Sequence, residues 1–177
     1  MITLYVGDNA NGKTRKLVDI IRLSRNNDVS VVTNIEKLRR DYLIDENKLQ
    51  YFKDNIYNDI CKYLIFNTPA KTMHEAGCRK LVELLYSKGD ILVLDELDAL
   101  LEPQEITDIS ECISYIAPLW KDIYISGYDI KLLRMFVNTD LDNAVETYSP
   151  NVYLLKDAAA YKLDEDDINE CFDEIRG

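Results

Sequence analysis

The sequence predicts an α/β fold with a mostly parallel central sheet and helices on both faces, arranged in three layers. β-rich segments alternate along the chain with longer segments in which apolar residues have helical spacing. One β-rich segment, residues 91–94, is apolar at every position, as expected of a strand buried on both faces. The 177 residues include 47% hydrophobic and 30% charged residues, which suits one globular domain with a substantial core.

The first half of the chain contains two expected strands and a long region of helical character. Apolar residues recur at every fourth position from Phe52 to Leu64, which predicts a buried helical stripe. Pro69 interrupts this region, and Gly89 follows the last expected helix. The expected elements are a strand at 2–6, a helix at 15–23, a strand at 29–33, mostly helical structure over 35–66, and a helix at 73–87.

The second half continues the alternation and closes with a pair of short strands. The expected elements are a strand at 91–94, a helix at 104–116, a strand at 123–126, a helix near 130–136, strands at 152–155 and 160–163, and a final helix that begins near 164. Neither a repeat nor a linker interrupts this order. We therefore expect a single domain over residues 1–177, with a helical insertion at about 36–88.

A glycine-bounded motif connects the first strand to the first helix. Residues 7–14 read G-D-N-A-N-G-K-T and match the pattern G-x-x-x-x-G-K-T. In this setting the loop amides surround nucleotide phosphates, and the helix N-terminus adds favourable dipole charge. The motif predicts a P-loop NTPase fold that binds a nucleoside triphosphate. The predicted nucleotide-binding residues are Gly7, Asp8, Asn9, Ala10, Asn11, Gly12, Lys13, Thr14 and Arg15.

Two carboxylates follow the apolar strand at residues 91–94. Ligands of open α/β sheets bind beyond the carboxyl ends of the strands, so Asp95 and Glu96 are expected beside the phosphate loop. We predict that Thr14 and Asp95 hold Mg²⁺, which prefers hard oxygen ligands. Lys13 would stabilise the transferring phosphate and Glu96 would act as the general base for water, so these two are the predicted catalytic residues. Alone, an apolar run before Asp-Glu could also begin a capped helix.

Composition excludes several other classes. The net charge of −11 opposes direct binding of nucleic acid by the isolated chain, because such binding depends on neutralising phosphates. The four cysteines lack C-x-x-C spacing, so neither a zinc site nor a disulfide framework is predicted, and reduced thiols indicate a cytoplasmic protein. No apolar run approaches membrane-spanning length, so membrane insertion is not expected. His74 is expected to be an exposed helical residue without a catalytic role.

Two other P-loop classes fit the sequence less well. A GTPase would carry an Asn-Lys-x-Asp guanine reader late in the fold, whereas the similar run N-K-L-Q at residues 47–50 lacks the acid and precedes the carboxylate strand. A small-molecule kinase would need an arginine-bearing lid and would leave Glu96 without a task. The adjacent carboxylates therefore favour ATP hydrolysis.

Residues 94–103, L-D-E-L-D-A-L-L-E-P, resemble the Walker B and D-loop stretch of ABC-class ATPases, especially the SMC-like and OLD-like branch. Residues 7–14 are similar to the Asn-containing phosphate loop of that branch. The resemblance implies that two ATP molecules are held between two head domains in a nucleotide-dependent homodimer. It also implies that residues 99–102 cross the dimer interface, with Glu102 at the acidic D-loop position.

Two elements of that family differ in this chain. The signature motif Ser-x-Gly-Glu/Gln-Arg/Lys is reduced to E-A-G-C-R-K at residues 75–80, which keeps the glycine and a basic residue. The switch histidine is replaced in I-S-G-Y at residues 125–128. Both differences predict slow hydrolysis, because the signature motif that would contact the γ-phosphate from a second subunit is altered and the switch histidine is missing.

The sequence leaves three interpretations of the biological role. The first is Mg-dependent ATP binding and slow hydrolysis that drives or gates a partner assembly, either a second copy of the chain or a separate effector protein. The second is a nucleotide-gated interaction subunit without significant turnover. The third is an ATPase of filamentous phage assembly, because the strand at residue 2 and the run V-V-T-N-I at 31–35 look like those of Zot-type proteins.

Overall fold

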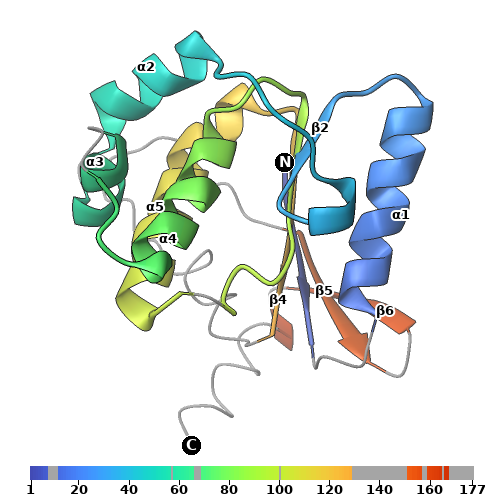
Figure 1. Cartoon of the computed structure of the whole chain (residues 1–177). Helices are drawn as coiled ribbons and strands as arrows, with labels where there is room; N and C mark the ends of the chain where they lie inside the picture. The colour runs from blue at the N-terminus through green and yellow to red at the C-terminus, as the bar shows by residue number, and fades with distance from the viewer. Residues whose placement is uncertain are drawn as a thin grey trace, which may run out of the picture.

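The computed structural model describes residues 1–7, 12–56, 58–65, 69–99, 101–128, 151–156, 159–164 and 166–167. In these residues a six-stranded sheet with the order β2-β3-β4-β1-β5-β6 forms the centre of the molecule (Figure 1). All neighbouring strands are parallel except β5 and β6. The predicted mixed α/β fold with a mostly parallel sheet is confirmed. The strands are β1 (Ile2–Val6), β2 (Val31–Thr33), β3 (Ile91–Leu94), β4 (Asp122–Gly127), β5 (Asn151–Lys156) and β6 (Ala159–Leu163).

Burial on both faces explains the composition of the inner strands. Every residue of β1, β2 and β3 is buried. Alternate side chains of a strand point to opposite faces, so an inner strand covered on both sides must be apolar nearly throughout. Leu92 and Leu94 join the larger core cluster, while Ile91 and Val93 join the smaller one. The apolar run at residues 91–94 is therefore accounted for by its two-sided environment.

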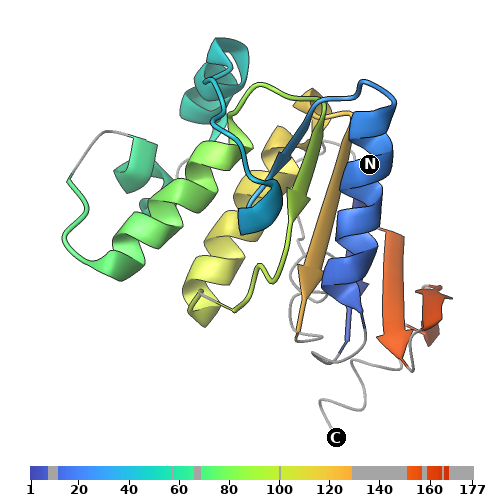
Figure 2. The same ribbon diagram turned by 45° about the vertical axis from the view of Figure 1, so that its right-hand side comes forward.

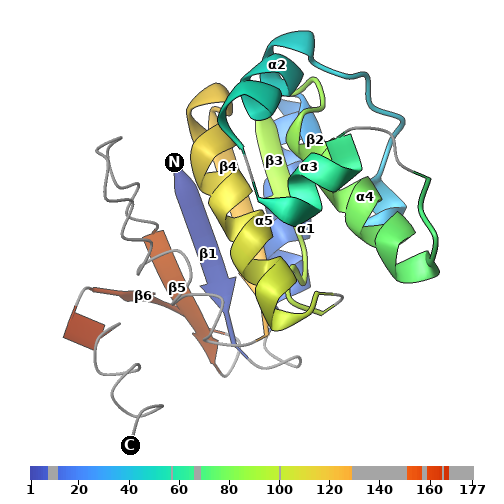
Figure 3. The same cartoon turned by 90° about the vertical axis from the view of Figure 1, so that its left-hand side faces the viewer.

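The helices divide unequally between the two faces of the sheet. α1 (Lys13–Asn26) packs through Leu17 and Ile21 against the smaller cluster (Figure 2). The opposite face is covered by α5 (Pro103–Ile116) and α4 (Met73–Leu85). Two shorter helices, α2 (Glu46–Asn55) and α3 (Asp59–Ile65), lie on the same side (Figure 3). Two single-turn 3₁₀ helices, η2 (Glu36–Leu38) and η3 (Ala117–Leu119), complete the described elements.

Polar side chains set the starts of three helices. Asp45 accepts hydrogen bonds from two backbone N–H groups at the start of α2, and Thr72 accepts one at the start of α4. At α5, Pro103 occupies the first turn and the Glu105 carboxylate accepts a hydrogen bond from the backbone N–H of Glu102 at 2.9 Å. These contacts satisfy N–H groups that have no partner within a helix. Glu102, at the D-loop position by resemblance, is thus the N-cap residue of α5.

The expectation of mostly helical structure over 35–66 is wrong for residues 39–45. This segment forms an isolated bridge between Ile44 and Ser87, and backbone hydrogen bonds join Asp45 to Tyr86 and Lys88 to Leu43. Tertiary pairing therefore overrides helical propensity there. The other predicted strands and helices within the described residues are present, while those near 130–136 and after 164 fall mainly outside them. The single domain and its helical insertion stay predictions.

Lys48 is a buried cation that contacts the turn between α4 and β3. Its Nζ donates hydrogen bonds to the carbonyl oxygens of Ser87 at 2.9 Å and Gly89 at 2.8 Å, and lies 3.2 Å from the centre of the Trp120 ring. Burial lowers the pKa of Lys48 to about 8, although Asp45 and Asp90 oppose the shift. These hydrogen bonds connect α2 to the turn that precedes β3.

No helix among the described residues is long and apolar enough to cross a membrane.

Candidate functional site

The turn between β1 and α1 requires glycine at its first position. Gly7 has a φ of +149°, and a Cβ atom there would lie 2.4 Å from the carbonyl oxygen of Leu155 in β5. Gly12 adopts a left-handed conformation with a φ of +81° immediately before α1. These two positions explain the glycines of the motif. Of the predicted loop residues, Asp8, Asn9, Ala10 and Asn11 lie outside the described part of the chain.

Lys13 begins α1 and its side chain is buried, with 4% exposure. Its Nζ donates a hydrogen bond to the carbonyl oxygen of Gly7 and lies 5.6 Å from the centre of the Tyr128 ring. Within the described residues, no carboxylate makes an ion pair with this ammonium. An anion bound beside this ammonium and the N-terminus of α1 would offset the cost of burying the charge. Arg15, in the same helical turn, is exposed.

Thr14 and Asp95 come together although they lie 81 residues apart. The Thr14 hydroxyl donates a hydrogen bond to Asp95 Oδ2 at 2.9 Å. The hydroxyl of Ser126, at the end of β4, donates to Asp95 Oδ1 at 2.6 Å. Because β4 lies between β1 and β3, its terminal serine reaches the carboxylate from the intervening strand. The ends of β3 and β4 and the N-terminus of α1 therefore converge on one carboxylate.

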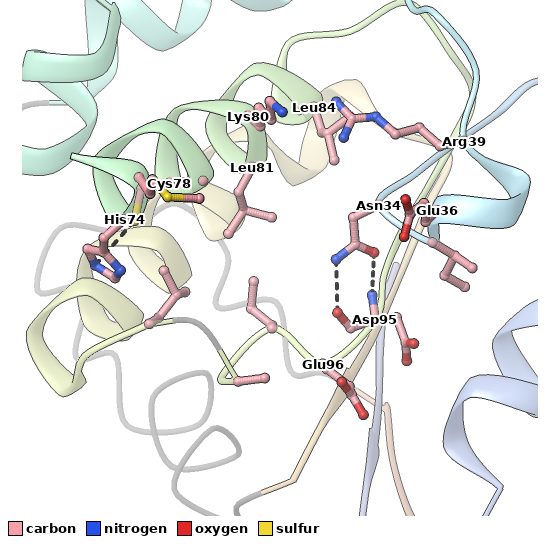
Figure 4. Close-up of a pocket in the computed structure, with 16 residues that line it drawn as sticks. Asn34, Glu36, Arg39, His74, Cys78, Lys80, Leu81, Leu84, Asp95 and Glu96 are labelled. Carbon is pink, nitrogen blue, oxygen red and sulfur yellow. Dashed lines mark hydrogen bonds between the residues drawn. The ribbon is translucent and has the colours of Figure 1, made fainter. Parts of the chain in front are cut away.

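Asn34 fixes the backbone of Asp95 from the other side. Its Oδ1 accepts a hydrogen bond from the Asp95 N–H at 2.7 Å, and its Nδ2 donates to the Asp95 carbonyl oxygen at 2.9 Å. Figure 4 shows this pair of contacts and the Asp95 carboxylate directed away from it. Since Asn34 directly follows β2, it holds the ends of β2 and β3 in register. The carboxylate is left to face Thr14 and Ser126.

Glu96 has an unusual backbone conformation. Its φ is +50°, in the left-handed region that costs a non-glycine residue about 1–2 kcal/mol. The Glu96 N–H donates to Ser126 Oγ at 2.8 Å, and the next N–H, of Leu97, donates to the Ser126 carbonyl oxygen at 3.0 Å. The side chain is exposed. Ser126 thus stabilises the strained turn and presents the Glu96 carboxylate to solvent.

A cavity of about 520 Å³ lies beside the two carboxylates, between α4 and the ends of β2 and β3. Asp95 and Glu96 line one end, and His74 and Cys78 of α4 line the other (Figure 4). Leu81, Leu84 and Leu97 give part of its wall an apolar character. The two carboxylates therefore lie at one end of a cavity that extends as far as α4.

The architecture is shared with proteins of known structure. The structure of cbiO1 from Clostridium perfringens, part of the ABC transporter complex cbiONQ, has a TM-score of 0.56 at 14% identity, covering 98% of this chain and 80% of that chain. A dimeric structure of MJ0796, a bacterial ABC transporter cassette, has a TM-score of 0.55 at 12% identity, covering 92% and 85%. The fold of this chain is therefore similar to that of these two proteins. A scan of protein-family models gives no match, and a search of curated proteins gives none either.

Two positions that the resemblance singled out are described by the structure. Residues 75–80, at the place of the signature motif, lie inside α4. Ser126, in the segment where a switch histidine was expected, contacts both Asp95 and the Glu96 backbone. The SMC-like or OLD-like branch stays a prediction.

Four residues of the site were not among the sequence-based candidates. Asn34 and Ser126 contact Asp95, and Tyr128 lies beside Lys13. The Tyr128 N–H donates to both carboxylate oxygens of Asp98, at 3.0 and 3.1 Å. Their positions in the sequence were the one indication of a role in the site. Asn34 directly follows one strand, and Ser126 and Tyr128 lie at the end of another. Asp98 lies three residues after Asp95.

Proposed function

We propose that the chain binds ATP with Mg²⁺ and hydrolyses it slowly. The 2.9 Å contact between the Thr14 hydroxyl and Asp95 carries this proposal, because it joins the phosphate-loop motif to the carboxylate strand. The buried ammonium of Lys13, at the start of the same helix, supplies positive charge next to them. A triphosphate is the ligand class that uses a glycine-bounded turn, a lysine and a pair of metal-binding oxygens together.

The donor set suits a magnesium ion. A hydroxyl and a carboxylate are hard oxygen ligands, and Mg²⁺ bound with ATP takes only one or two such groups from the protein. Thr14 and Asp95 would hold the ion, and Ser126 would keep the Asp95 carboxylate oriented through its 2.6 Å hydrogen bond. When bound, the ion would neutralise charge on the phosphate oxygens.

The remaining groups have distinct tasks in hydrolysis. Lys13 would exchange its contact with the Gly7 carbonyl for the β- and γ-phosphate oxygens, and the N-terminus of α1 would face the same charge. Glu96 would accept a proton from a water molecule as the water oxygen bonds to the γ-phosphorus. The bond from that phosphorus to the bridging oxygen breaks, so ADP leaves with the bond electrons and inorganic phosphate is formed.

Slow turnover by the isolated chain is part of the proposal. The motif that would reach the γ-phosphate from a second subunit is altered at residues 75–80, which lie within α4. His74, the one histidine of the sequence, lies at the opposite end of the cavity from Glu96. We further propose that turnover drives or gates either a nucleotide-dependent homodimer or a separate effector in the cytoplasm. MJ0796, which shares the fold, has dimeric structures, one of them bound to ADP and Pi.

The test compares two variants with matched controls. Lys13→Ala should abolish the heat of Mg·ATP binding in calorimetry, while Lys16→Ala, an exposed cation on the same helix, should leave it unchanged. Glu96→Gln should retain binding and lose at least about 100-fold in turnover, because it removes the general base. Glu36→Gln, another carboxylate that lines the cavity, should keep full turnover. Absence of binding heat, or unchanged turnover in Glu96→Gln, would refute the proposal.

A nucleotide-gated interaction subunit is the second candidate, favoured by the altered residues 75–80 in α4. Size measurement of Glu96→Gln with and without Mg·ATP separates the two. If hydrolysis drives the cycle, the variant accumulates an ATP-bound assembly that the wild type releases. If the nucleotide only gates binding, wild type and variant assemble to the same extent.

A further inference from the structure

Three metal-ligating side chains meet between α4 and α5, at the end of the cavity opposite Asp95 and Glu96. His74 and Cys78 lie four residues apart and so face the same side of α4, and Glu105 extends from the first turn of α5. His74 Nε2 is 2.7 Å from Glu105 Oε1 and 3.0 Å from Oε2. Cys78 Sγ is 3.7 Å from His74 Nε2 and 3.5 Å from Glu105 Oε2. One nitrogen, one sulfur and one oxygen thus converge.

These separations are close to those of a tetrahedral zinc site. With Zn–S near 2.3 Å and Zn–N or Zn–O near 2.0–2.1 Å, tetrahedral angles place sulfur about 3.5 Å from the other two ligand atoms. The separations of 3.7 and 3.5 Å in the structure agree with this. The nitrogen–oxygen separation would have to increase from 3.0 Å to about 3.4 Å, which rotation of the exposed imidazole can supply.

We propose that His74, Cys78 and Glu105 bind a divalent transition-metal ion of the Zn²⁺ class and thereby join α4 to α5. The mixed sulfur, nitrogen and oxygen set selects such an ion over Mg²⁺ or Ca²⁺, which take oxygen ligands. Three protein ligands leave a fourth position for water, and the cavity lined by His74 and Cys78 gives water access.

The surroundings favour a cation at this point. The carboxylates of Glu105, Glu102 and Glu75 place negative charge around the Cys78 thiol. The same negative charges attract a divalent ion, which would displace the thiol proton on binding. Glu105 uses Oε1 to cap the Glu102 N–H, which leaves Oε2 for coordination. His74 is about half exposed, with 46% side-chain exposure, so an ion can enter from solvent on its side.

The ion would stiffen the segment that follows the carboxylate strand. Residues 96–102 connect Glu96 to the start of α5, and Glu105 anchors that start to α4. Cysteine spacing could not predict this site because its third ligand lies 27 residues beyond Cys78, on another helix. None of the three ligands is a predicted nucleotide-binding residue, so the site can be tested without ATP.

The first experiment is calorimetric titration of Zn²⁺ into the metal-free, untagged chain, with Co²⁺ absorption as a second readout. We expect one Zn²⁺ per chain, release of about one proton, and a sulfur-to-Co²⁺ charge-transfer band. Cys78→Ser and His74→Gln should each weaken binding by about 100-fold or more. The control Cys112→Ser removes a thiol of the buried Cys61–Cys112 contact, and Glu111→Gln removes another α5 carboxylate. Both should bind the ion as the wild type does.

The second experiment uses the imidazole as a reporter in the unmutated protein, so it does not depend on how a variant folds. His74 is the one histidine of the sequence, and its ring nitrogen resonances therefore have a single source. Stoichiometric Zn²⁺ should shift the Nε2 resonance to that of a metal-bound imidazole. The proposal is overturned if Zn²⁺ binds no more tightly than millimolar, if the His74 resonances do not move, or if Cys78→Ser binds as tightly as the wild type.

Discussion

Replacing Gly7 by alanine tests the close approach of the phosphate loop to the sheet. Two costs add at this position. A φ of +149° is unfavourable for alanine by about 1–3 kcal/mol. The new Cβ would also lie 2.4 Å from the Leu155 carbonyl oxygen, so the ends of β1 and β5 must separate by about 1 Å to restore ordinary contact. We expect a total loss of about 3–4 kcal/mol in the free energy of unfolding.

Gly77 provides the matched control. It lies within α4, and a Cβ atom there would meet nothing within 4 Å. Gly77→Ala should therefore stabilise the protein by about 0.5–1 kcal/mol through helix propensity. Urea unfolding followed by circular dichroism, without nucleotide, measures both variants, and Gly7→Ala should also lower Tm by roughly 6–15 °C. If Gly7→Ala is within about 0.5 kcal/mol of wild type, the described packing of the turn against β5 is wrong.

Three further predictions concern the ends of the strands and the buried lysine. Ser126→Ala should lower the free energy of unfolding in urea by about 1–3 kcal/mol and the turnover rate by about tenfold. The reason is that the Asp95 carboxylate and the Glu96 N–H each lose a hydrogen-bond partner. The control Ser114→Ala in α5 should lower the free energy of unfolding by less than about 1 kcal/mol. Glu96→Gly should abolish turnover. It should also raise the free energy of unfolding by about 0.5–1 kcal/mol, because glycine adopts a φ of +50° without strain. A decrease in the free energy of unfolding would contradict this. Because the pKa of Lys48 is about 8 when folded and about 10.5 when unfolded, the unfolded chain binds more protons between these values. The contribution of Lys48 to the free energy of unfolding therefore rises with pH over this interval. Lys48→Met should flatten the dependence of the free energy of unfolding on pH, measured from pH 8 to about 9.5. Parallel curves for wild type and variant would exclude the lowered pKa.

The sequence was most informative where a local pattern and its environment agree. The apolar run at residues 91–94 and the carboxylates after it indicated a buried strand whose end carries chemistry. The role of Ser126 depends on strand order, which places β4 between β1 and β3. The periodicity of apolar residues contains no information about strand order, so the position of the Ser126 hydroxyl beside Asp95 could not be predicted from the sequence. Asn34 was missed for the same reason, since its partner is a backbone group 61 residues away.

Other differences arise where a tertiary contact competes with local preference. Residues 39–45 were expected to be helical together with the periodic stripe that follows them, but their backbone groups pair with the segment around Ser87 instead. The apolar stripe from Phe52 to Leu64 is buried as predicted at both ends, yet it is divided between α2 and α3. Asn58 accounts for the division, because its Oδ1 accepts from the Cys61 N–H while its Nδ2 donates to the Asp108 carbonyl oxygen.

The position of β1 in the sheet has a consequence for how the protein is made. Ile2 pairs with Ile123 and Thr3 with Asn151, so both neighbours of this strand are synthesised about 120–150 residues after it. Until then the backbone N–H and C=O groups along both edges of this strand lack their partners, a state that favours aggregation of the nascent chain. The approach of Gly7 to Leu155 and of Lys13 to Tyr128 can form only once these later strands have emerged, so the phosphate-loop motif reaches its final surroundings late in synthesis.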